Sequence, residues 1–351
     1  MKNTSGLTIS MLIPCHNEEE MVARCIDSCL AQTRPLDEII VVNDGSTDNS
    51  AAILASYGNK IRVITIPKAT GNKSRAQEIG FKSITTDIFI ATDGDTIIHP
   101  NFTKEIEQDF IKHPHIHAVA GYVKSLRYNY LTALREIDYT VGQNLYKLAQ
   151  AHINFLLVIP GCAGAFRTKT FSKYINFEHD TLTEDLDFTF KMHKHNLHIH
   201  YNTKAIVYTQ DPPTLKSYIN QMRRWYCGGW QSLKKHITRL SAPNAAYQLT
   251  ISYAEGLLFA CTFFILPIIN IKAFLTLVTL NLSVAIILGT YAAICRRRWD
   301  MLLVCPISLI LSIINAWVFL EQFFKEIVRN KNNMVWFHPE RRKITTNDNN
   351  L

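Results

Sequence analysis

Charged residues are scarce in this chain of 351 residues: they make up 19% of it, against roughly 25% in an ordinary soluble protein. Hydrophobic residues make up 47%, which excludes intrinsic disorder, because a disordered chain needs low hydrophobicity. Cysteine is also sparse, with 8 residues in the whole chain, and this excludes a small disulfide scaffold. The sequence has neither GxGxxG nor GxxxxGK[ST], which disfavours a dinucleotide-dependent dehydrogenase and a P-loop ATPase.

The start of the chain lacks the pattern of a secretory signal peptide, which is a positively charged lead followed by a long apolar stretch. We therefore expect the polar N-terminal part to be cytoplasmic and its cysteines to be reduced. The formal net charge is +8, but part of this charge lies beside apolar runs and no recognised nucleic-acid-binding motif is present. Nucleic acid is accordingly not expected as a partner.

Hydrophobicity is concentrated near the C-terminus, in three runs of about the ~20 residues that a helix needs to cross a bilayer. The first run carries one formal charge, Glu255, and the other two carry none. Buried core helices of a soluble protein are the alternative, but three such runs in close succession are typical of a membrane domain. Within residues 246–328 we predict spanning helices at about 249–270, 273–295 and 301–322, followed by a basic polar tail, 329–351.

The orientation of these runs is left open by the charge pattern. Arg296, Arg297 and Arg298 lie between the second and third runs, and the positive-inside rule places them in the cytoplasm together with residues 1–240. A third crossing would then carry the basic tail to the outside. Either the tail departs from the rule or one of the runs does not cross. The expected location is a bacterial-type inner or plasma membrane, with a multi-pass chain.

Residues 1–123 alternate between short apolar runs and helical patterns, which indicates a mostly parallel sheet covered by helices. Ligands of such sheets bind beyond the carboxyl ends of the strands. The expected strands are 7–14, 38–44, 61–66, 87–93 and 118–123, and the expected helices are 18–32, 48–57, 73–84 and 100–112.

Polar clusters follow three of these strands, at 14–18, 43–46 and 93–95. Asp93 and Asp95 are the most informative residues, because two carboxylates one residue apart at a strand end can hold a hard cation such as Mg²⁺ or Mn²⁺ together with substrate phosphates. The simpler interpretation is a solvated Asp-Gly turn. The position of the pair after an apolar strand, in line with Asp44, favours a phosphate–metal site.

The second half of the polar part carries three further motifs. Residues 161–167 are small and permissive, as where a backbone closely approaches a ligand. Thr183-Glu184-Asp185 follows, and then Gln221-Met222-Arg223-Arg224-Trp225 places an aromatic ring beside two arginines, which suits a sugar next to a pyrophosphate. Membrane-surface snorkelling is the alternative for the arginines. Residues 128–158 and 212–237 are expected to form helices near the membrane surface, although core packing also explains the apolar spacing of the former.

Histidines alternate at 113, 115 and 117 and again at 198 and 200, a spacing that can place them on one strand face for metal chelation. No acidic residue is placed in the sequence to orient them, so we interpret them as exposed or hydrogen-bonded side chains. Cys25 and Cys29 are one helical turn apart, without further ligands nearby in sequence.

Taken in order, Asp44, Asp93-x-Asp95, Thr183-Glu184-Asp185 and Gln221-x-x-Arg224-Trp225, followed by apolar runs, resemble the membrane-bound glycosyltransferases of family 2. Synthases of cellulose, chitin, hyaluronan and poly-N-acetylglucosamine belong to this group. The resemblance covers about residues 8–230. It implies an α/β fold of the GT-A type, with a mostly parallel sheet that binds a nucleotide-sugar, followed by a helical transmembrane domain.

The resemblance also implies roles for single residues. Asp185 would be the catalytic base, and Asp95 would bind the metal, Mg²⁺ or Mn²⁺. Residues that would bind the nucleotide-sugar are Pro14, His16, Glu18, Asp44, Lys73, Asp93 and Arg224. Residues that would bind the acceptor are Gly161, Cys162, Gly164, Glu184, Gln221 and Trp225.

The chain departs from the family pattern at several positions. Asn72 stands where a glycine usually precedes the lysine, Glu78 where asparagine is usual, and Asn43 where the first aspartate of Asp-Asp-Gly-Ser is common. Met222 replaces a frequent arginine, and residues 336–341 match a tail motif of many relatives only in part. N-terminal membrane segments, which polymer-secreting relatives usually have, are not seen, so we do not expect this chain alone to export a polymer, and a partner subunit for export is a candidate partner.

The predicted reaction is therefore inverting transfer of a sugar from a UDP-sugar, with UDP-N-acetylglucosamine expected, to a growing polysaccharide at the membrane. The alternative is a non-processive enzyme that transfers a single sugar to a lipid acceptor. A membrane protein that binds nucleotide-sugar without turnover is a third interpretation, and the intact acidic motifs speak against it. The partners expected are UDP-sugar, a polysaccharide or lipid acceptor and membrane lipid.

Overall fold

A mixed eight-stranded sheet forms the centre of the N-terminal part, in the strand order β3-β2-β1-β4-β7-β6-β8-β5. The structure is a computed structural model that describes residues 6–237, 243–331, 334 and 342. Strand β1 pairs in parallel with β2 and with β4, and β2 pairs in parallel with β3. Strand β7 is antiparallel to both of its neighbours, β4 and β6. The strands are β1 (Ile9–Cys15), β2 (Glu38–Asp44), β3 (Arg62–Ile66), β4 (Ile88–Ala91), β5 (Ile97–Ile98), β6 (Ala118–Leu126), β7 (Gly164–Arg167) and β8 (Ile199–Gln210).

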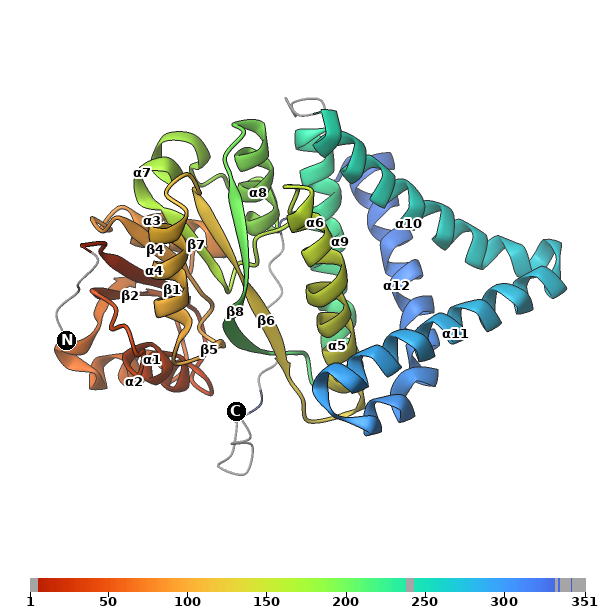
Figure 1. Ribbon diagram of the computed structural model, residues 1–351, viewed down its shortest axis with the longest axis horizontal. Helices are drawn as coiled ribbons and strands as arrows, with labels where there is room; N and C mark the ends of the chain where they lie inside the picture. The colour runs from red at the N-terminus through yellow and green to blue at the C-terminus, as the bar shows by residue number, and fades with distance from the viewer. Residues whose placement is uncertain (1–5, 238–242, 332–333, 335–341, 343–351) are drawn as a thin grey trace.

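Helices connect the strands and cover both faces of the sheet (Figure 1). The α-helices of this part are α1 (Val22–Leu30), α2 (Ser50–Ser56), α3 (Lys73–Phe81), α4 (Phe102–Lys112), α5 (Tyr130–Val141), α6 (Lys147–His152), α7 (Thr168–Thr170), α8 (Glu184–Lys194) and α9 (Leu215–His236). Short 3₁₀ or π segments are η1 (Gly58–Lys60), η2 (Gly142–Tyr146) and η3 (Phe171–Ile175).

The apolar strands are explained by burial on both faces, because successive side chains of a strand point to opposite sides. In β1, Met11 and Ile13 join the core beneath α1, α2 and α4, while Leu12 joins the core beneath α3, η3 and α8. The GT-A type of fold with a mostly parallel sheet, expected from the sequence, is confirmed. The parallel strands end at one edge, where the polar clusters lie.

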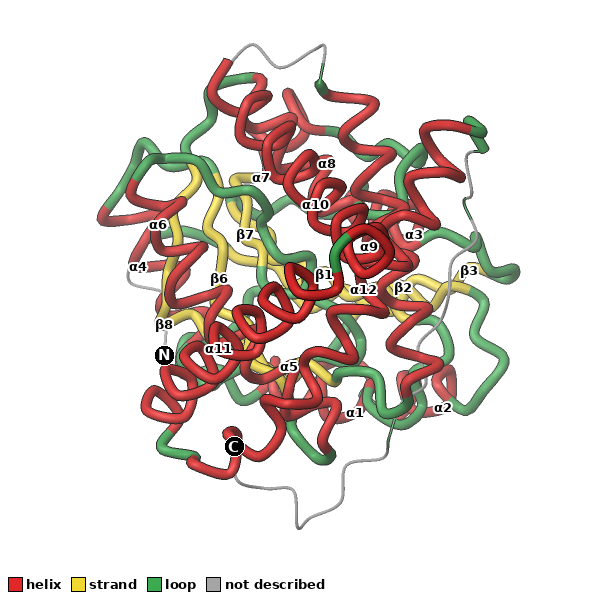
Figure 2. The backbone as a smooth tube through the Cα atoms, turned by 90° about the vertical axis from the view of Figure 1, so that its right-hand side faces the viewer, coloured by secondary structure: helices red, strands yellow, loops and turns green. Residues whose placement is uncertain are grey.

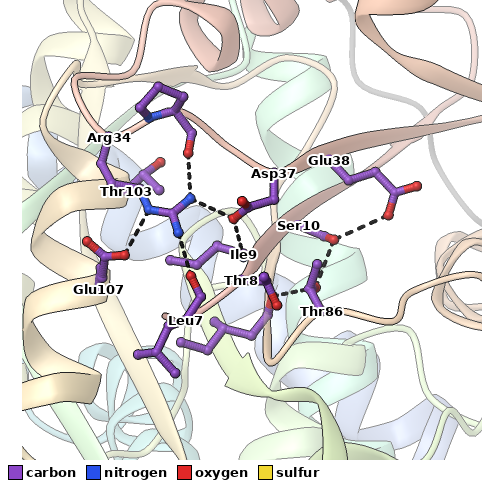
Figure 3. Close-up of polar contacts among 12 residues, drawn as sticks. Leu7, Thr8, Ile9, Ser10, Arg34, Asp37, Glu38, Thr86, Thr103 and Glu107 are labelled. Carbon is purple, nitrogen blue, oxygen red and sulfur yellow. Dashed lines mark hydrogen bonds and ion pairs between the residues drawn. The ribbon is translucent and has the colours of Figure 1, made fainter. Parts of the chain in front are cut away.

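The opposite edge of the sheet is closed by a polar network centred on Arg34 (Figure 3). The Arg34 guanidinium pairs with Asp37 at 2.7 Å and Glu107 at 2.9 Å and donates to the Leu7 carbonyl at 2.7 Å. Asp37 in turn accepts a hydrogen bond from the Ile9 backbone at 2.8 Å. These contacts fix the starts of β1 and β2 and leave their carboxyl ends to the ligand site.

Two predicted helices are shorter than their sequence patterns indicated. The expected helix 18–32 begins at Val22, because Asn17 adopts a left-handed φ of 54° and the residues after it form a turn. The helical pattern over 128–158 is interrupted by the π-helix η2 and ends at His152. Both differences place a loop or an irregular turn close to the ligand edge of the sheet.

Three helical spans of the C-terminal part are long and apolar enough to cross a membrane, by length and composition: Thr250–Ile269, Ile271–Arg296 and Trp299–Val328, with mean hydropathies of 1.7, 2.1 and 2.3. They overlap the three predicted spans. Helices α10 (Pro243–Ile269) and α11 (Ile271–Arg296) form a hairpin that projects away from the sheet (Figure 1). The third span consists of η4 (Trp299–Ile307), α12 (Ser308–Phe323) and η5 (Phe324–Val328).

The third span packs on the sheet-bearing part, and so do parts of the hairpin, through Ala292 and Ala293 of α11 and Tyr253 of α10. Met301 and Val318 of this span are buried in one cluster with Leu134 of α5 and Met222 of α9. Figure 2, viewed from the helical side, shows these helices in front of the sheet. The helix α9 therefore lies between the ligand edge and the apolar spans. The predicted tail, 329–351, and the partial motif at 336–341 fall almost wholly outside the described residues.

Candidate active site

The loops after β1 and β2 are joined by direct hydrogen bonds. The Nδ1 atom of His16 lies 2.6 Å from the carbonyl oxygen of Asp44, and Ser46 Oγ accepts a hydrogen bond from the Asn17 backbone at 3.1 Å. The Asp44 carboxylate accepts two hydrogen bonds from Thr70, from the backbone N–H at 2.8 Å and from the hydroxyl at 2.7 Å. His16 and Asp44, predicted from the sequence to bind the nucleotide, are thus in direct contact, and Thr70, which was not predicted, also contacts Asp44.

The Asp93-Gly94-Asp95 turn lies against the loop that follows β1. A Cβ atom added to Gly94 would lie 3.3 Å from Cγ of Glu18 and 3.5 Å from the carbonyl oxygen of Pro14. Asp95 is 5% exposed, and its Oδ1 accepts a hydrogen bond from the Thr96 hydroxyl at 3.3 Å. Pro14, Glu18, Asp93 and Asp95 are therefore brought together at the carboxyl ends of β1 and β4.

Lys73 connects this turn to the start of α8. Its Nζ lies 2.5 Å from Asp93 Oδ1 and 2.7 Å from Glu184 Oε1. Burial would lower the pKa of Lys73, but the charges of Asp93 and Glu184 outweigh it and raise that pKa above its ordinary value. Asn72, which stands where relatives have glycine, caps α3 by accepting a hydrogen bond from the Ser74 backbone at 2.8 Å. Glu184, which the resemblance assigns to acceptor binding, thus forms an ion pair with Lys73.

Asp185 lies in the first turn of α8, beside the glycine-containing loop. Its carboxylate accepts hydrogen bonds from the backbone of Leu186 at 2.9 Å and of Gly161 at 3.3 Å. Desolvation by the surrounding protein and the negative charge of Glu184 raise the pKa of Asp185 to about 6, against the lowering effect of Lys73. A Cβ atom at Gly161 would lie 3.1 Å from Lys73 Nζ and 3.4 Å from Glu184 Oε1, so the loop backbone closely approaches these side chains.

Cys162 lies near Asp93, Asp95 and Asp185. Burial, followed by the negative charges of Asp93 and Asp95, raises the pKa of the Cys162 thiol well above its ordinary value. Its carbonyl oxygen accepts a hydrogen bond from the Thr92 hydroxyl at 3.0 Å. A neutral thiol in this position can line a pocket but does not act as a nucleophile. The neighbouring Gly164 begins β7.

The helix α9 contributes Gln221 and Trp225. Gln221 is 7% exposed, and its Oε1 has no hydrogen-bond partner in the described part of the chain. An unsatisfied buried carbonyl of this kind suits a ligand hydroxyl. The Trp225 ring lies 5.1 Å from the guanidinium of Arg135, which Asp211 holds at 3.4 Å.

The two neighbouring arginines of α9 point in different directions. Arg223 pairs with Glu321 of α12 at 2.9 Å, on the side of the apolar spans. Arg224 is partly buried, one helical step away. Arg224, turned by about 100° from Arg223 around the helix, stays a predicted diphosphate-binding residue.

Lys147 is a further residue at this site, and sequence reasoning missed it. It lies on α6, is 8% exposed, and its Nζ is 5.8 Å from the centroid of the Tyr201 ring. Burial lowers its pKa to about 8, against the opposing charge of Asp185. The signal in the sequence was a single lysine within an apolar helical pattern.

The histidine clusters lie elsewhere, at the starts of β6 and β8. The rings of His113 and His200 are 5.1 Å apart, and Asp109 lies 3.6 Å from His200, an acidic neighbour that the sequence pattern did not reveal. Among the described residues, no three His, Cys, Asp or Glu side chains form a group that could hold a metal ion. This holds for Cys25 and Cys29 as well, which are buried in the core.

Comparison with known proteins gives matches in sequence and in fold. Residues 6–228 match the family described as "Glycosyltransferase like family 2". The chain is 28% identical over 228 residues to the poly-beta-1,6-N-acetyl-D-glucosamine synthase of Staphylococcus epidermidis, and 26% identical over 228 residues to the enzyme of that name from Staphylococcus aureus. Each match covers 64% of this chain and 55% of the relative, so the chain spans about half the length of the curated relatives it matches.

Solved structures show a similar fold. A mannosyltransferase from Pyrobaculum calidifontis, PcManGT, in complex with GDP-Man and Mn²⁺, superimposes with a TM-score of 0.58 at 16% identity over 87% of both chains. TarS 1–349 of Staphylococcus aureus in complex with UDP-GlcNAc superimposes with a TM-score of 0.52 at 16% identity over 91% of this chain and 92% of that one. At these identities the likeness concerns the fold.

Proposed function

Because the chain belongs to glycosyltransferase family 2, we propose that it transfers N-acetylglucosamine from UDP-N-acetylglucosamine, with inversion, to a growing polysaccharide at a membrane. The observation that carries this proposal is the arrangement around Lys73. The Asp93-Gly94-Asp95 turn, the Asp185 carboxylate and the glycine-containing loop come from distant parts of the chain and converge there. Such a site holds a base and a diphosphate-binding group side by side.

The reaction is a single displacement. The acceptor hydroxyl oxygen forms a bond to the anomeric carbon of the donor while the bond from that carbon to the diphosphate oxygen breaks. The hydroxyl proton passes to the carboxylate of Asp185, and UDP leaves with the bonding electron pair. General base catalysis of this type contributes about 10²–10⁴-fold in rate. The backbone N–H groups of Gly161 and Leu186 hold this carboxylate in its orientation.

The leaving diphosphate needs positive charge. Lys73 supplies one charge, and Arg224 is the second candidate. Asp95 and Asp93 provide hard oxygen ligands, which fit Mg²⁺ or Mn²⁺ that completes its coordination with phosphate oxygens. A bound divalent ion would stabilise the charge that develops on UDP.

Acceptor binding is assigned to the side of α9. The unpartnered Oε1 of Gln221 can accept a hydrogen bond from a sugar hydroxyl, and the Trp225 ring offers an apolar face for a sugar ring. The loop from Gly161 to Gly164 contacts Asp185 through the backbone N–H of Gly161. Because α9 packs against α12, the acceptor path runs close to the apolar spans. We infer that the catalytic part faces the cytoplasm, on the side of Arg296–Arg298.

The names of the relatives support the choice of donor and acceptor. The curated relatives are poly-beta-1,6-N-acetyl-D-glucosamine synthases, and the structural neighbour TarS binds UDP-GlcNAc. The test is transfer of radiolabel by membranes that contain the full chain. UDP-N-acetylglucosamine, UDP-glucose and UDP-glucuronate are offered with Mn²⁺ or Mg²⁺, and the products are resolved by size.

A long labelled polymer from UDP-N-acetylglucosamine, abolished by a chelator, is the expected result. If the label instead moves into the organic phase as a single sugar, the acceptor is a lipid and not a polysaccharide. UDP binding without transfer from any donor would contradict an enzymatic role for this chain on its own. Polymer formation in the presence of excess chelator would contradict the metal assignment.

The pH dependence of transfer follows from Asp185. The pKa of this carboxyl is raised to about 6, so the base is ionised above that pH and protonated below it. The transfer rate at saturating substrate should therefore fall about tenfold per pH unit as the pH drops below 6, and reach a plateau above 7. A rate that stays constant between pH 5 and 7, with UDP still bound, would contradict a base with this pKa.

A further inference from the structure

A buried carboxylate lies at the end of the third apolar span. Glu326 of η5 is 1% exposed, although it follows a helix rich in apolar residues. Its Oε1 accepts a hydrogen bond from the Cys227 thiol at 3.1 Å, and its Oε2 accepts one from the Gln231 amide at 3.3 Å. Both donors are on α9, the helix that carries Gln221 and Trp225. The third span is thus tied to α9 by a buried polar contact, in addition to the ion pair of Arg223 with Glu321 and the hydrogen bond from Tyr218 to Asn315.

Gln231 extends this contact to the segment before the proposed base. Its Oε1 accepts a hydrogen bond from the backbone N–H of Leu182 at 3.0 Å, and Gln231 itself is 6% exposed. Leu182 is three residues before Asp185. One amide side chain therefore bonds Glu326 through its nitrogen and the catalytic segment through its oxygen.

The same face of α9 packs closely against residues 182–184. A Cβ atom at Gly228 would lie 2.9 Å from the backbone nitrogen of Thr183 and 2.6 Å from its hydroxyl oxygen. Such distances leave no room for a side chain, so the glycine permits the close approach. Ser232, one turn further along, lies 3.5 Å from the Thr183 hydroxyl. The segment 182–184 therefore rests on α9 between Gly228 and Ser232.

We propose that Glu326, acting through Gln231, is a positioning residue for Asp185, and that the third apolar span thereby sets the geometry of the base. The proposal rests on the proposed function. A buried carboxylate is costly unless its oxygens are hydrogen-bonded, and replacing such a group by apolar side chains is often neutral or stabilising. Here the buried carboxylate of Glu326 holds the amide of Gln231 in one orientation, in which the amide oxygen accepts the hydrogen bond from Leu182.

The arrangement allows a reciprocal exchange of the two side chains. In the double variant Gln231→Glu/Glu326→Gln, the carboxylate at 231 can accept from the Leu182 N–H and from the amide at 326. The amide oxygen at 326 can still accept from the Cys227 thiol. The single variant Gln231→Glu instead places two carboxylates face to face. Gln231→Met removes both hydrogen bonds without adding charge.

We expect Gln231→Glu to lower kcat about tenfold and Gln231→Met to lower it several-fold, with the affinity for UDP unchanged, because the donor loops after β1, β2 and β4 lie elsewhere. The double variant should recover to within about twofold of the unaltered protein, since residues in one network couple by 0.5–3 kcal/mol. Glu321→Gln is the matched control, because Glu321 lies on the same span and pairs with Arg223 and Lys325.

Hydrogen exchange gives a readout that does not depend on activity. The full chain is purified in detergent, and the exchange of the peptide that contains Leu182 is followed. Exchange should be faster in Gln231→Met and Gln231→Glu and return to the original rate in the double variant. Recovery of neither kcat nor protection in the double variant would overturn the proposal, as would a fall in UDP affinity that parallels kcat. If the unaltered protein transfers no sugar, the proposed function fails, while the exchange data still test the positioning.

Discussion

Asp185→Asn is expected to lower sugar transfer about 10²–10⁴-fold while UDP binding stays within about twofold. The amide has nearly the shape of the carboxylate and can still accept the Leu186 N–H, but it cannot take a proton from the acceptor hydroxyl. UDP binding persists because the nucleotide is assigned to the loops at His16, Asp44 and Asp93. The measurements are single-turnover transfer in membranes and titration of the purified protein with UDP.

Asp180→Asn is the matched control for this variant. It makes the same chemical change five residues earlier, at a side chain that is 59% exposed and pairs with Lys235, and it should leave transfer unchanged. A parallel loss of UDP binding in Asp185→Asn would indicate a structural role in shaping the donor pocket. Unimpaired transfer would rule Asp185 out as the base and redirect the search to Glu184.

Asp187→Asn is expected to have the largest effect on stability. Asp187 is 1% exposed and lies 2.8 Å from Lys191 Nζ, 2.8 Å from Lys235 Nζ and 2.7 Å from His236 Nε2, so it joins α8 to the end of α9. Removing one charge from a buried pair costs about 3–5 kcal/mol, because the partner charges stay buried without compensation. We expect a fall of about 3 kcal/mol, since Lys235 keeps Asp180 as a partner. Thermal unfolding in detergent measures it.

The pH dependence identifies the origin of this effect. Burial would raise the pKa of Asp187, but the hydrogen bond from His236 and the charge of Lys191 hold it well below its usual range. The stabilisation is therefore complete above the ordinary aspartate pKa of about 3.9 and is lost as the pH falls below it. The difference between the variant and the unaltered protein should shrink in the same range. The control Asp180→Asn should cost less than about 1 kcal/mol. A difference that stays constant down to pH 3 would exclude an ionic origin.

The ligand edge of the sheet was predictable because the sequence pattern there is local. Strand β2 was placed at 38–44, as observed, and the polar residues that follow strands must meet at one edge of a parallel sheet. The left-handed turn at Asn17 and the π-helix at Gly142–Tyr146 were not predicted. Neither has a pattern of its own, since each results from the packing of neighbouring loops and helices.

Contacts between residues far apart in the sequence could not be predicted from local sequence patterns. Thr70 on Asp44, Glu184 on Lys73 and Lys147 near Asp185 depend on how loops from different strands approach one another. Acidic residues such as Glu184 are compatible with several roles until their nearest cation is known. Likewise, Asp109 was not recognised as the neighbour of His200 because it lies on α4, far from that histidine in sequence.

The sequence by itself determined the class of fold, the three apolar spans and the order of the acidic motifs, because hydrophobic period, run length and strand-end chemistry are properties of neighbouring residues. The tertiary structure alone decided which carboxylate meets which cation, why Arg223 turns to α12, and how Glu326 reaches the segment of Asp185 through Gln231. The physical reason is that these contacts join residues far apart in the sequence, such as Arg223 and Glu321, which are 98 positions apart. Only the packing of α8, α9 and the third span brings such residues within hydrogen-bonding distance.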